Sequence, residues 1–351
     1  MERARPAGEA AGLHPFTRPG WALAIGYDFA RAQIEPKAGA HDLEACAECL
    51  RIDAPIVFPP SDLSAAREPV APGAFTLGPA KSRVGREAFV RAASRVIEYI
   101  RAGDVYQVNL AHPLHAAFTG DTRAAFIAMA QRARPAFGAY LELEHRAALS
   151  LSPEAFLTYD PATRIVTTRP MKGTRALGPG AEASLRTSEK DRAELAMITD
   201  LMRNDLGRVC EFGSMRVTEP RTLEHHAGVV QTVSQVQGRL RDGLHARDLV
   251  AAVFPGGSVT GAPKVRAMQI IRELEPHARG LYCGAMGYLT DEGALTLSIA
   301  IRTATIDLKT STLEYPVGAG IVADSDPEEE WRETLAKAWP LLGATTLEDA
   351  P

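Results

Sequence analysis

Apolar residues recur at three- and four-residue intervals between Phe89 and Ile100, the spacing of one face of a helix, and Gly103 follows as a typical helix stop. Four further helices are predicted. Ser188, a favoured capping residue, begins one, and the pair Asp326-Pro327 begins the last. The helix that Ser188 begins is expected at 188–205, and the remaining two at 124–133 and 262–274.

Short runs of apolar and β-branched residues bounded by turn residues predict strands. They lie at 21–27, 54–58, 105–110, 139–143, 147–151, 282–289, 295–306 and 313–317. Strands and helices do not alternate strictly, which favours meanders in an antiparallel or mixed sheet with helices outside, an α/β (α+β) fold. Residues 1–85, rich in Pro, Gly and Ala, are expected to form a short N-terminal region packed on the main fold, and no linker follows them.

Composition excludes several classes of protein. The 351 residues are 46% hydrophobic and 23% charged, as in globular chains, and the net charge of −4 gives no electrostatic reason to bind nucleic acid or an anionic membrane. No apolar run reaches the roughly 18 residues that span a bilayer, and the N-terminus lacks the apolar core of a secretory signal. Four scattered cysteines are too few for a disulfide framework, so we expect a cytoplasmic protein.

Glu194 is the first candidate for chemistry. Ile198 and Leu201 follow it by four and seven residues and place it on the apolar side of its predicted helix. A buried lone carboxylate is costly, so a cation should meet it. An internal Arg or Lys and a divalent metal both remain possible.

The last predicted helix carries a possible second metal ligand. Glu330, Glu333 and Lys337 share one of its faces, a pattern that by itself is more typical of a solvated surface. Two carboxylates from two helices would nevertheless suit Mg²⁺, which prefers oxygen ligands and retains water or substrate oxygens.

Residues 256–264 form a glycine-rich loop that leads into a predicted helix. Such a loop directs backbone N–H groups at an anion, here a small carboxylate rather than a nucleotide. Gly256 and Gly261 have the spacing of a Walker A loop, but Ala262 stands where that motif requires lysine. A tight turn that needs glycine is the alternative.

Arg302 falls, by alternation along the predicted strand 295–306, on the side that carries Thr296 and Ser298. Small neighbours leave an arginine room to bind a carboxylate through two hydrogen bonds, although a charge at a sheet edge would show the same pattern. Gly318-Ala319-Gly320, after the next predicted strand, offers further backbone N–H groups to an anion.

Lys172 and Glu154 are candidates for covalent and acid–base chemistry. A lysine between Pro170 and Gly173 is usually exposed, but one removed from water becomes a neutral nucleophile. Glu154 follows a predicted strand and is a candidate general acid, or else an ordinary turn carboxylate. Zinc is disfavoured, because the pair Cys46 and Cys49 has no second pair.

Several of these segments are similar to those of the chorismate-utilising enzymes, over about three quarters of the chain. The blocks, in the family's order, are 103–110, 152–154, 171–174, 190–194 with 203–209, 254–264, 298–303 and 318–337. The resemblance implies an anthranilate-synthase-like fold, with two facing, mostly antiparallel sheets and helices outside. It also implies that 86–345 is the chorismate-binding catalytic domain.

Two positions distinguish branches of this family. Gln107 stands where branches that add water carry a lysine base, and Lys172 stands where anthranilate synthases usually have alanine. The resemblance therefore implies the aminodeoxychorismate synthase branch, which forms 4-amino-4-deoxychorismate for p-aminobenzoate and folate. Anthranilate synthase component I is the nearest alternative, and a non-catalytic scaffold that docks an amidotransferase is the second.

The resemblance also implies roles for single residues. Glu194 and Glu333 would hold Mg²⁺ at the ring carboxylate of chorismate, with Lys337 beside it. Lys172 would attack C2 while Glu154 protonates the departing C4 hydroxyl. The substrate carboxylates would be held by a set of side chains and backbone groups, namely Arg302, Tyr288, Thr260, Gly261, Gly318, Ala319 and Gly320.

No glutaminase unit is recognisable in the chain. The resemblance implies that ammonia comes from a glutamine amidotransferase subunit or from free ammonium. The chain departs from the family at Gln231, where a histidine is common, and in its short N-terminal region.

Overall fold

The computed structural model describes residues 19–30, 47–52, 73–226, 229–341 and 345–348. All five predicted helices are confirmed, as α3 (Gly85–Arg101), α4 (Thr122–Ala133), α6 (Glu189–Gly207), α8 (Lys264–Leu274) and α9 (Pro327–Ala336). The expected caps are present as well. The Ser188 side chain accepts a hydrogen bond from the Asp191 N–H, and Asp326 accepts two from the first turn of α9. Two helices were not predicted, α5 (Ala181–Thr187) and α7 (Ala246–Val253).

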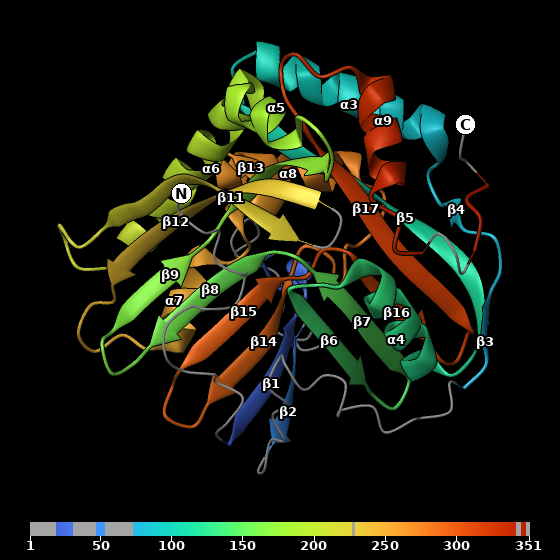
Figure 1. Ribbon diagram of the computed structural model, residues 1–351, viewed down its shortest axis with the longest axis horizontal. Coiled ribbons are helices and arrows are strands. Elements are labelled where there is room, and N and C mark those ends of the chain that lie inside the picture. The colour runs from blue at the N-terminus through green and yellow to red at the C-terminus, as the bar shows by residue number, and fades with distance from the viewer. Residues whose placement is uncertain (1–18, 31–46, 53–72, 227–228, 342–344, 349–351) are drawn as a thin grey trace.

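The described strands form two sheets whose ladders are antiparallel, as the resemblance implied (Figure 1). The first has the order β10 (Met171–Ala176), β12 (Val229–Arg239), β9 (Ile165–Thr168), β8 (Ala155–Asp160), β15 (Leu295–Ile299), β14 (Ala285–Thr290), β1 (Gly20–Ile25) and β2 (Ala47–Ile52), and β11 (Arg216–His226) pairs with β12. The second has the order β13 (Gly261–Ala262), β5 (Gln107–Gly120), β17 (Thr312–Ile321), β16 (Thr303–Asp307), β7 (Arg146–Ser152) and β6 (Phe137–Glu142), with β3 (Phe75–Leu77) and β4 (Lys81–Ser82) on β5.

Five of the described helices lie together on one side of this arrangement, whereas α4 packs against β6 and β7 and α7 against α6. Figure 1 shows α3, α5, α6, α8 and α9 together above the sheets, with α3 beside α9. One core cluster joins α3, α8 and α9 to the second sheet, and another joins α6 and α7 to the first. A smaller cluster around Ala148, Met286 and Ala300 connects the sheets.

The predicted strand 295–306 is wrong, because the chain leaves one sheet and enters the other within it. β15 ends at Ile299 and β16 begins at Thr303. Arg302 lies in the crossing with a φ of 50°, and its carbonyl accepts a hydrogen bond from the Leu151 N–H at 3.0 Å. The apolar positions change phase at the crossing: they are odd-numbered up to Ile301 and even-numbered at Ala304 and Ile306. This reversal is the sequence signal of the interruption, and treating 295–306 as one strand overlooked it.

Other boundaries also shift. Residues 318–320 lie inside β17 rather than after it, and Lys172 lies in β10 rather than beside a turn. The helix predicted from Ala262 begins at Lys264, because Gly261 and Ala262 pair with Val108 and Gln107 of β5. The predicted strand 54–58 lies outside the described residues.

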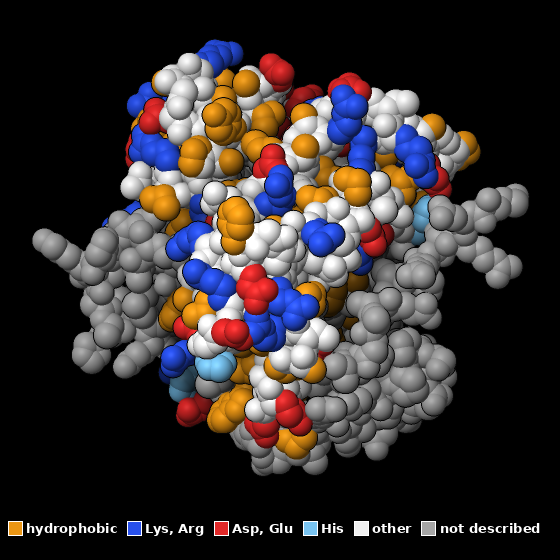
Figure 2. All heavy atoms as spheres, turned by 90° about the vertical axis from the view of Figure 1, so that its left-hand side faces the viewer, with side chains coloured by type: hydrophobic (Ala, Val, Ile, Leu, Met, Phe, Trp, Pro, Cys, Tyr) orange, Lys and Arg blue, Asp and Glu red, His pale blue; other side chains and the backbone are white. Residues whose placement is uncertain are grey.

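No helix in the described part of the chain is long and apolar enough to cross a lipid bilayer. Figure 2 shows Lys and Arg side chains intermixed with Asp and Glu on one face of the molecule.

Candidate active site

A cavity of about 630 Å³ brings together residues from β10, α6, β17, α9 and the crossing between the sheets. It collects side chains that are far apart in the sequence. The predicted residues among its lining are Glu154, Lys172, Glu194, Arg302, Gly318, Gly320, Glu333 and Lys337. Tyr288, Thr260, Gly261 and Ala319 do not line it.

Glu154 is buried between β7 and β8 at the inner wall of the cavity. Burial raises the pKa of its carboxyl to about 7, although a hydrogen bond from Ser258 and the charges of Lys172 and Arg302 lower it. The Ser258 hydroxyl donates to Oε1 at 2.7 Å and fixes the orientation of the group. A carboxyl with this pKa is partly protonated at neutral pH, which a general acid requires.

Lys172 reaches the cavity from an irregular point of β10. The register between β10 and β12 shifts between Lys172 and Thr174, where Gly173 has a φ of 73°. A Cβ on Gly320 would lie 2.5 Å from Nε2 of Gln107, so the glycine leaves room for that side chain, and it would be in ordinary contact with Nζ of Lys172 at 3.7 Å. Lys172 is half-buried, which is less than a fully desolvated amine.

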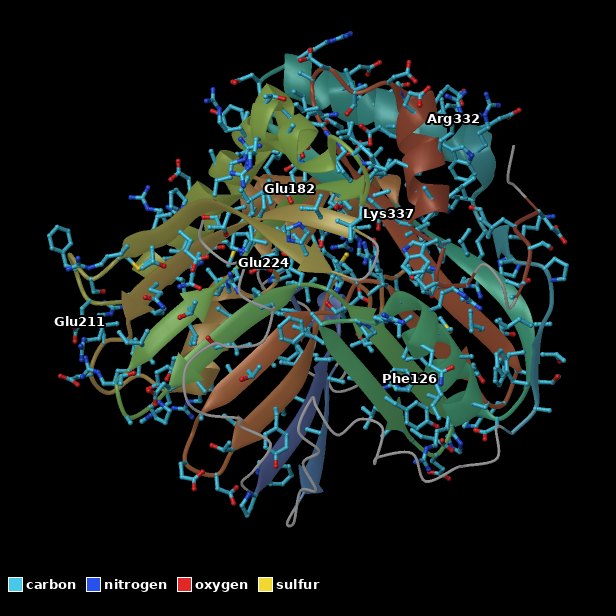
Figure 3. All side chains as sticks on the ribbon, viewed as in Figure 1. Phe126, Glu182, Glu211, Glu224, Arg332 and Lys337 are labelled. Atoms are coloured by element: carbon cyan, nitrogen blue, oxygen red, sulfur yellow. The ribbon has the colours of Figure 1, made fainter. Side chains whose placement is uncertain are left out.

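Glu194 and Glu333 face the same part of the cavity from two helices. Burial raises the pKa of Glu194, and the charges of Asp191 and Glu333 raise it further, while those of Lys172 and Lys190 lower it. Burial also acts on Glu333, but Lys337, whose Nζ lies 2.8 Å from its Oε1, brings that pKa below its usual value. Figure 3 shows Lys337 at the end of α9 nearer the middle of the molecule, and its Nζ also donates to the Gly318 carbonyl at 2.8 Å.

The chemistry of these donors fits a divalent cation. Glu194 has no hydrogen-bond or ion-pair partner among the described residues, although it is partly buried. Lys172 and Lys190 lie near Glu194, but neither forms an ion pair with it. The negative charge of this carboxylate is therefore not neutralised by a direct contact. No group of three or more His, Cys, Asp or Glu suited to a metal is present in the described part, so water or ligand oxygens would complete the coordination.

Arg302 lies near a tyrosine other than the one predicted. Burial raises the pKa of Tyr315, and Arg302 lowers it, while its hydroxyl has no hydrogen-bond partner among described residues. Tyr282 also lines the cavity. An arginine and a buried, unpaired hydroxyl at one wall can together bind a carboxylate.

The prediction that Tyr288 lines the site is not supported by its position. Tyr288 is buried in the middle of β14, on the same side of the strand as Met286, which packs into the cluster between the sheets. Tyr282, which precedes β14, lines the cavity instead of the Tyr288 that the resemblance implied.

Three other predicted residues lie behind the cavity wall. The Thr260 hydroxyl donates to the carbonyls of Gly256 and Gly257 at 3.1 and 3.3 Å and thereby closes the loop. Gly261 has a φ of 142°, and a Cβ there would lie 2.1 Å from the Gln107 carbonyl oxygen. Ala319 is buried in the core of the second sheet.

Gly318 and Gly320 remain available to a ligand. β16 pairs with β17 only at residues 312–314, so β17 has no strand on that side at Gly318 and Gly320. Alternate residues of an antiparallel strand direct their N–H groups away from the partner strand. These positions can therefore present N–H groups to an anion.

Sequence reasoning missed Ser258, Lys190 and Tyr315 as lining residues. Ser258 stands in the glycine-rich loop and Lys190 one helical turn before Glu194, so both had a local signal. Tyr315 had none, because its role depends on the neighbouring crossing at Arg302.

Comparison with known proteins identifies the relatives of this chain. Residues 8–343 match the family model described as chorismate binding enzyme. Aminodeoxychorismate synthase component 1 of Escherichia coli is 46% identical over 75% of this chain and 58% of its own length. Anthranilate synthase component 1 of Thermus thermophilus is 41% identical over 80% of this chain and 62% of its own.

The chain spans less than two thirds of the length of these two relatives. Among solved structures, anthranilate synthase component I of Streptococcus pneumoniae superposes with a TM-score of 0.73 at 28% identity, covering 95% of this chain and 82% of that one. This similarity confirms the predicted fold. The chain belongs to the chorismate-binding enzymes.

Proposed function

We propose that this chain converts chorismate and ammonia to 4-amino-4-deoxychorismate. One observation carries the proposal: an amine, Lys172, and a carboxyl with a pKa of about 7, Glu154, line a single cavity. The relatives named aminodeoxychorismate synthase component 1 support the same branch.

The reaction proceeds by two displacements. The amine of Lys172, which must first lose its proton, forms a bond to C2 and the ring double bonds shift. The C4–oxygen bond breaks as Glu154 gives its proton to the departing hydroxyl, which leaves as water. Ammonia then forms a bond to C4, the double bonds shift back, and the C2–nitrogen bond breaks to release the lysine. The proton lost by ammonia balances the one that Glu154 gave.

The substrate's two carboxylates are bound at separate places. Arg302 and Tyr315 hold the enolpyruvyl carboxylate, together with Tyr282. The N–H groups of Gly318 and Gly320 contribute at the ring carboxylate.

Glu194 and Glu333 would hold Mg²⁺ beside the ring carboxylate. When bound, the ion withdraws electron density from that carboxylate and so favours displacement on the ring. Lys337 holds Glu333 in place through their ion pair.

We also propose that a glutamine amidotransferase supplies the ammonia. The name "component 1" of the relatives supports a second component. Free ammonium at high concentration should replace this partner.

Formation of anthranilate is the second candidate, since anthranilate synthase component 1 of Thermus thermophilus is 41% identical. Chorismate, Mg²⁺ and ammonium incubated with the protein distinguish the two by product mass and fluorescence. A non-fluorescent amino product with the mass of 4-amino-4-deoxychorismate supports the proposal, and anthranilate as the direct product overturns it. No consumption of chorismate with any ammonia source would favour a scaffold.

A further inference from the structure

A buried histidine outside the cavity joins α9 to β5. His112 of β5 has no exposure to solvent. Its ring stacks on Trp331 of α9, with centroids 4.5 Å apart and planes 24° apart, and Phe89 of α3 meets it edge-on at 5.3 Å. Three elements therefore converge on one imidazole.

The hydrogen bonds at this imidazole have a single consistent direction. The Thr334 hydroxyl donates to the Trp331 carbonyl at 2.7 Å, so it can only accept from Nε2 of His112, 2.8 Å away. Nε2 therefore carries the proton, and Nδ1 accepts from the Ser82 hydroxyl at 2.9 Å. Ser82 Oγ in turn accepts from the Gly85 N–H at 3.1 Å, at the start of α3.

The imidazole remains neutral in this position. Burial lowers the pKa of His112 to about 3, and the charge of His277 lowers it further. A neutral ring is at once a donor and an acceptor, which this chain of hydrogen bonds requires.

The residues that His112 contacts alternate along α9 with those that reach the cavity. Trp331 and Thr334 are buried against the core, whereas Glu330 and Glu333 line the cavity. Because all four lie within two turns of one rigid helix, the contacts at Trp331 and Thr334 contribute to the rotation of α9, together with the packing of Leu335 in the same core cluster. That rotation decides where the Glu333 carboxylate stands relative to Glu194 of α6.

We propose that the Ser82–His112–Thr334 hydrogen-bond chain positions the carboxylates of α9 and thereby sets the affinity of the cavity for a divalent cation. This rests on the proposed function, which places the cation at Glu194 and Glu333. His112 touches neither the cation nor the substrate, so it is a positioning residue.

Binding of Mn²⁺ to the full chain, followed by electron paramagnetic resonance without chorismate, tests the proposal. Thr334→Val keeps the shape of the side chain but removes the hydroxyl, and Thr334→Ser keeps the hydroxyl. We expect Thr334→Val and His112→Phe to bind Mn²⁺ several-fold more weakly. The effect should be smaller than the roughly tenfold or greater loss on removing a group hydrogen-bonded directly to a metal ligand, because these residues act on Glu333 only through the helix. Thr334→Ser should retain most of the affinity of the unmodified chain.

The control is Leu249→Ala in α7, a buried change in the other core cluster. It should lower the melting temperature but leave Mn²⁺ affinity unchanged. Unchanged Mn²⁺ affinity in folded Thr334→Val, or no Mn²⁺ binding by the unmodified chain, would overturn the proposal. If the variants bind Mn²⁺ more weakly but the unmodified chain consumes no chorismate, the positioning role stands and the proposed function is refuted.

Discussion

Burial and ion pairing, rather than residue type, distinguish the roles of the two glutamates Glu154 and Glu333 in this cavity. Glu154 is fully enclosed and its pKa rises to about 7, whereas Lys337 holds the pKa of half-exposed Glu333 below its usual value. One glutamate is thus suited to donate a proton and the other to remain a charged ligand. Identical side chains acquire different chemistry from their surroundings.

The pH dependence of catalysis should reflect Glu154. A proton donor must be protonated, so kcat/KM for chorismate should fall as the pH rises through about 7. Glu154→Gln should be much slower and should lose this fall. A pH profile of the unmodified chain without a loss of rate near pH 7 would exclude Glu154 as the acid.

The same group should affect stability. Its pKa in the folded protein lies above the ordinary value of 4.5, so the folded state binds the proton more tightly. The contribution of Glu154 to the free energy of unfolding should therefore be fully present below pH 4.5 and be lost as the pH rises through about 7. Urea denaturation should show a smaller decline in Glu154→Gln.

Lys172→Ala should abolish the covalent step. A protein–substrate adduct is expected when the unmodified chain is mixed with chorismate and Mg²⁺ without ammonia, and intact-mass spectrometry should detect it. The variant should show no adduct and slower formation of the amino product, with anthranilate as an alternative product. Lys309→Ala, at an exposed turn, is the matched control. Full activity in Lys172→Ala would exclude covalent catalysis.

At the scale of elements, α6 and α9 carry the proposed cation ligands. Glu194→Gln should raise the Mg²⁺ concentration for half-maximal activity by at least about tenfold, since even partners of metal ligands contribute that much. Titration of Mg²⁺ in the activity assay measures this. Glu182→Gln on α5, outside the cavity and labelled in Figure 3, should leave the requirement unchanged.

The loop before α8 depends on a buried ion pair. Lys264 Nζ lies 2.5 Å from Asp205 Oδ2 and donates to the carbonyls of Val253 and Pro255. Lys264→Met would leave Asp205 buried and unpaired, so we expect a loss of about 3–5 kcal/mol in the free energy of unfolding. Urea denaturation measures it. The double variant Lys264→Met with Asp205→Asn should recover part of the lost stability. Equal losses in the single and the double variant would contradict an ion pair between Lys264 and Asp205.

Helices and most strands could be predicted because periodicity and caps are local signals. Glu154, Lys172 and the α6 and α9 carboxylates could be placed in one site through the family's motifs. The interruption at Arg302 had a local signal, because the apolar positions change from odd to even between Ile301 and Ala304. The change of sheet itself could not be predicted, because such a reversal does not reveal which sheet the following residues join. Tyr288 was assigned from the family resemblance, and no local pattern pointed to Tyr282, which lines the cavity.

At the scale of the whole molecule, the site is made where the two sheets meet. Arg302 belongs to the segment that leaves one sheet for the other, and α9 packs on β17 of the second sheet. Arg302→Lys should raise the KM for chorismate about tenfold, or roughly 1.4 kcal/mol, because lysine cannot form the paired hydrogen bonds. Steady-state kinetics measure this. An unchanged KM would show that Arg302 does not bind a carboxylate of the substrate.

The Arg302 crossing has a mechanical consequence. In the proposed site, Arg302 would bind one carboxylate of a small rigid diacid. A cation held by Glu194 and Glu333 would bind the other. The ligand would then connect the segment that crosses between the sheets with α6 and α9. A relative movement of the two sheets would weaken both contacts at once. Binding of such a diacid should therefore restrict this movement and raise the melting temperature of the protein.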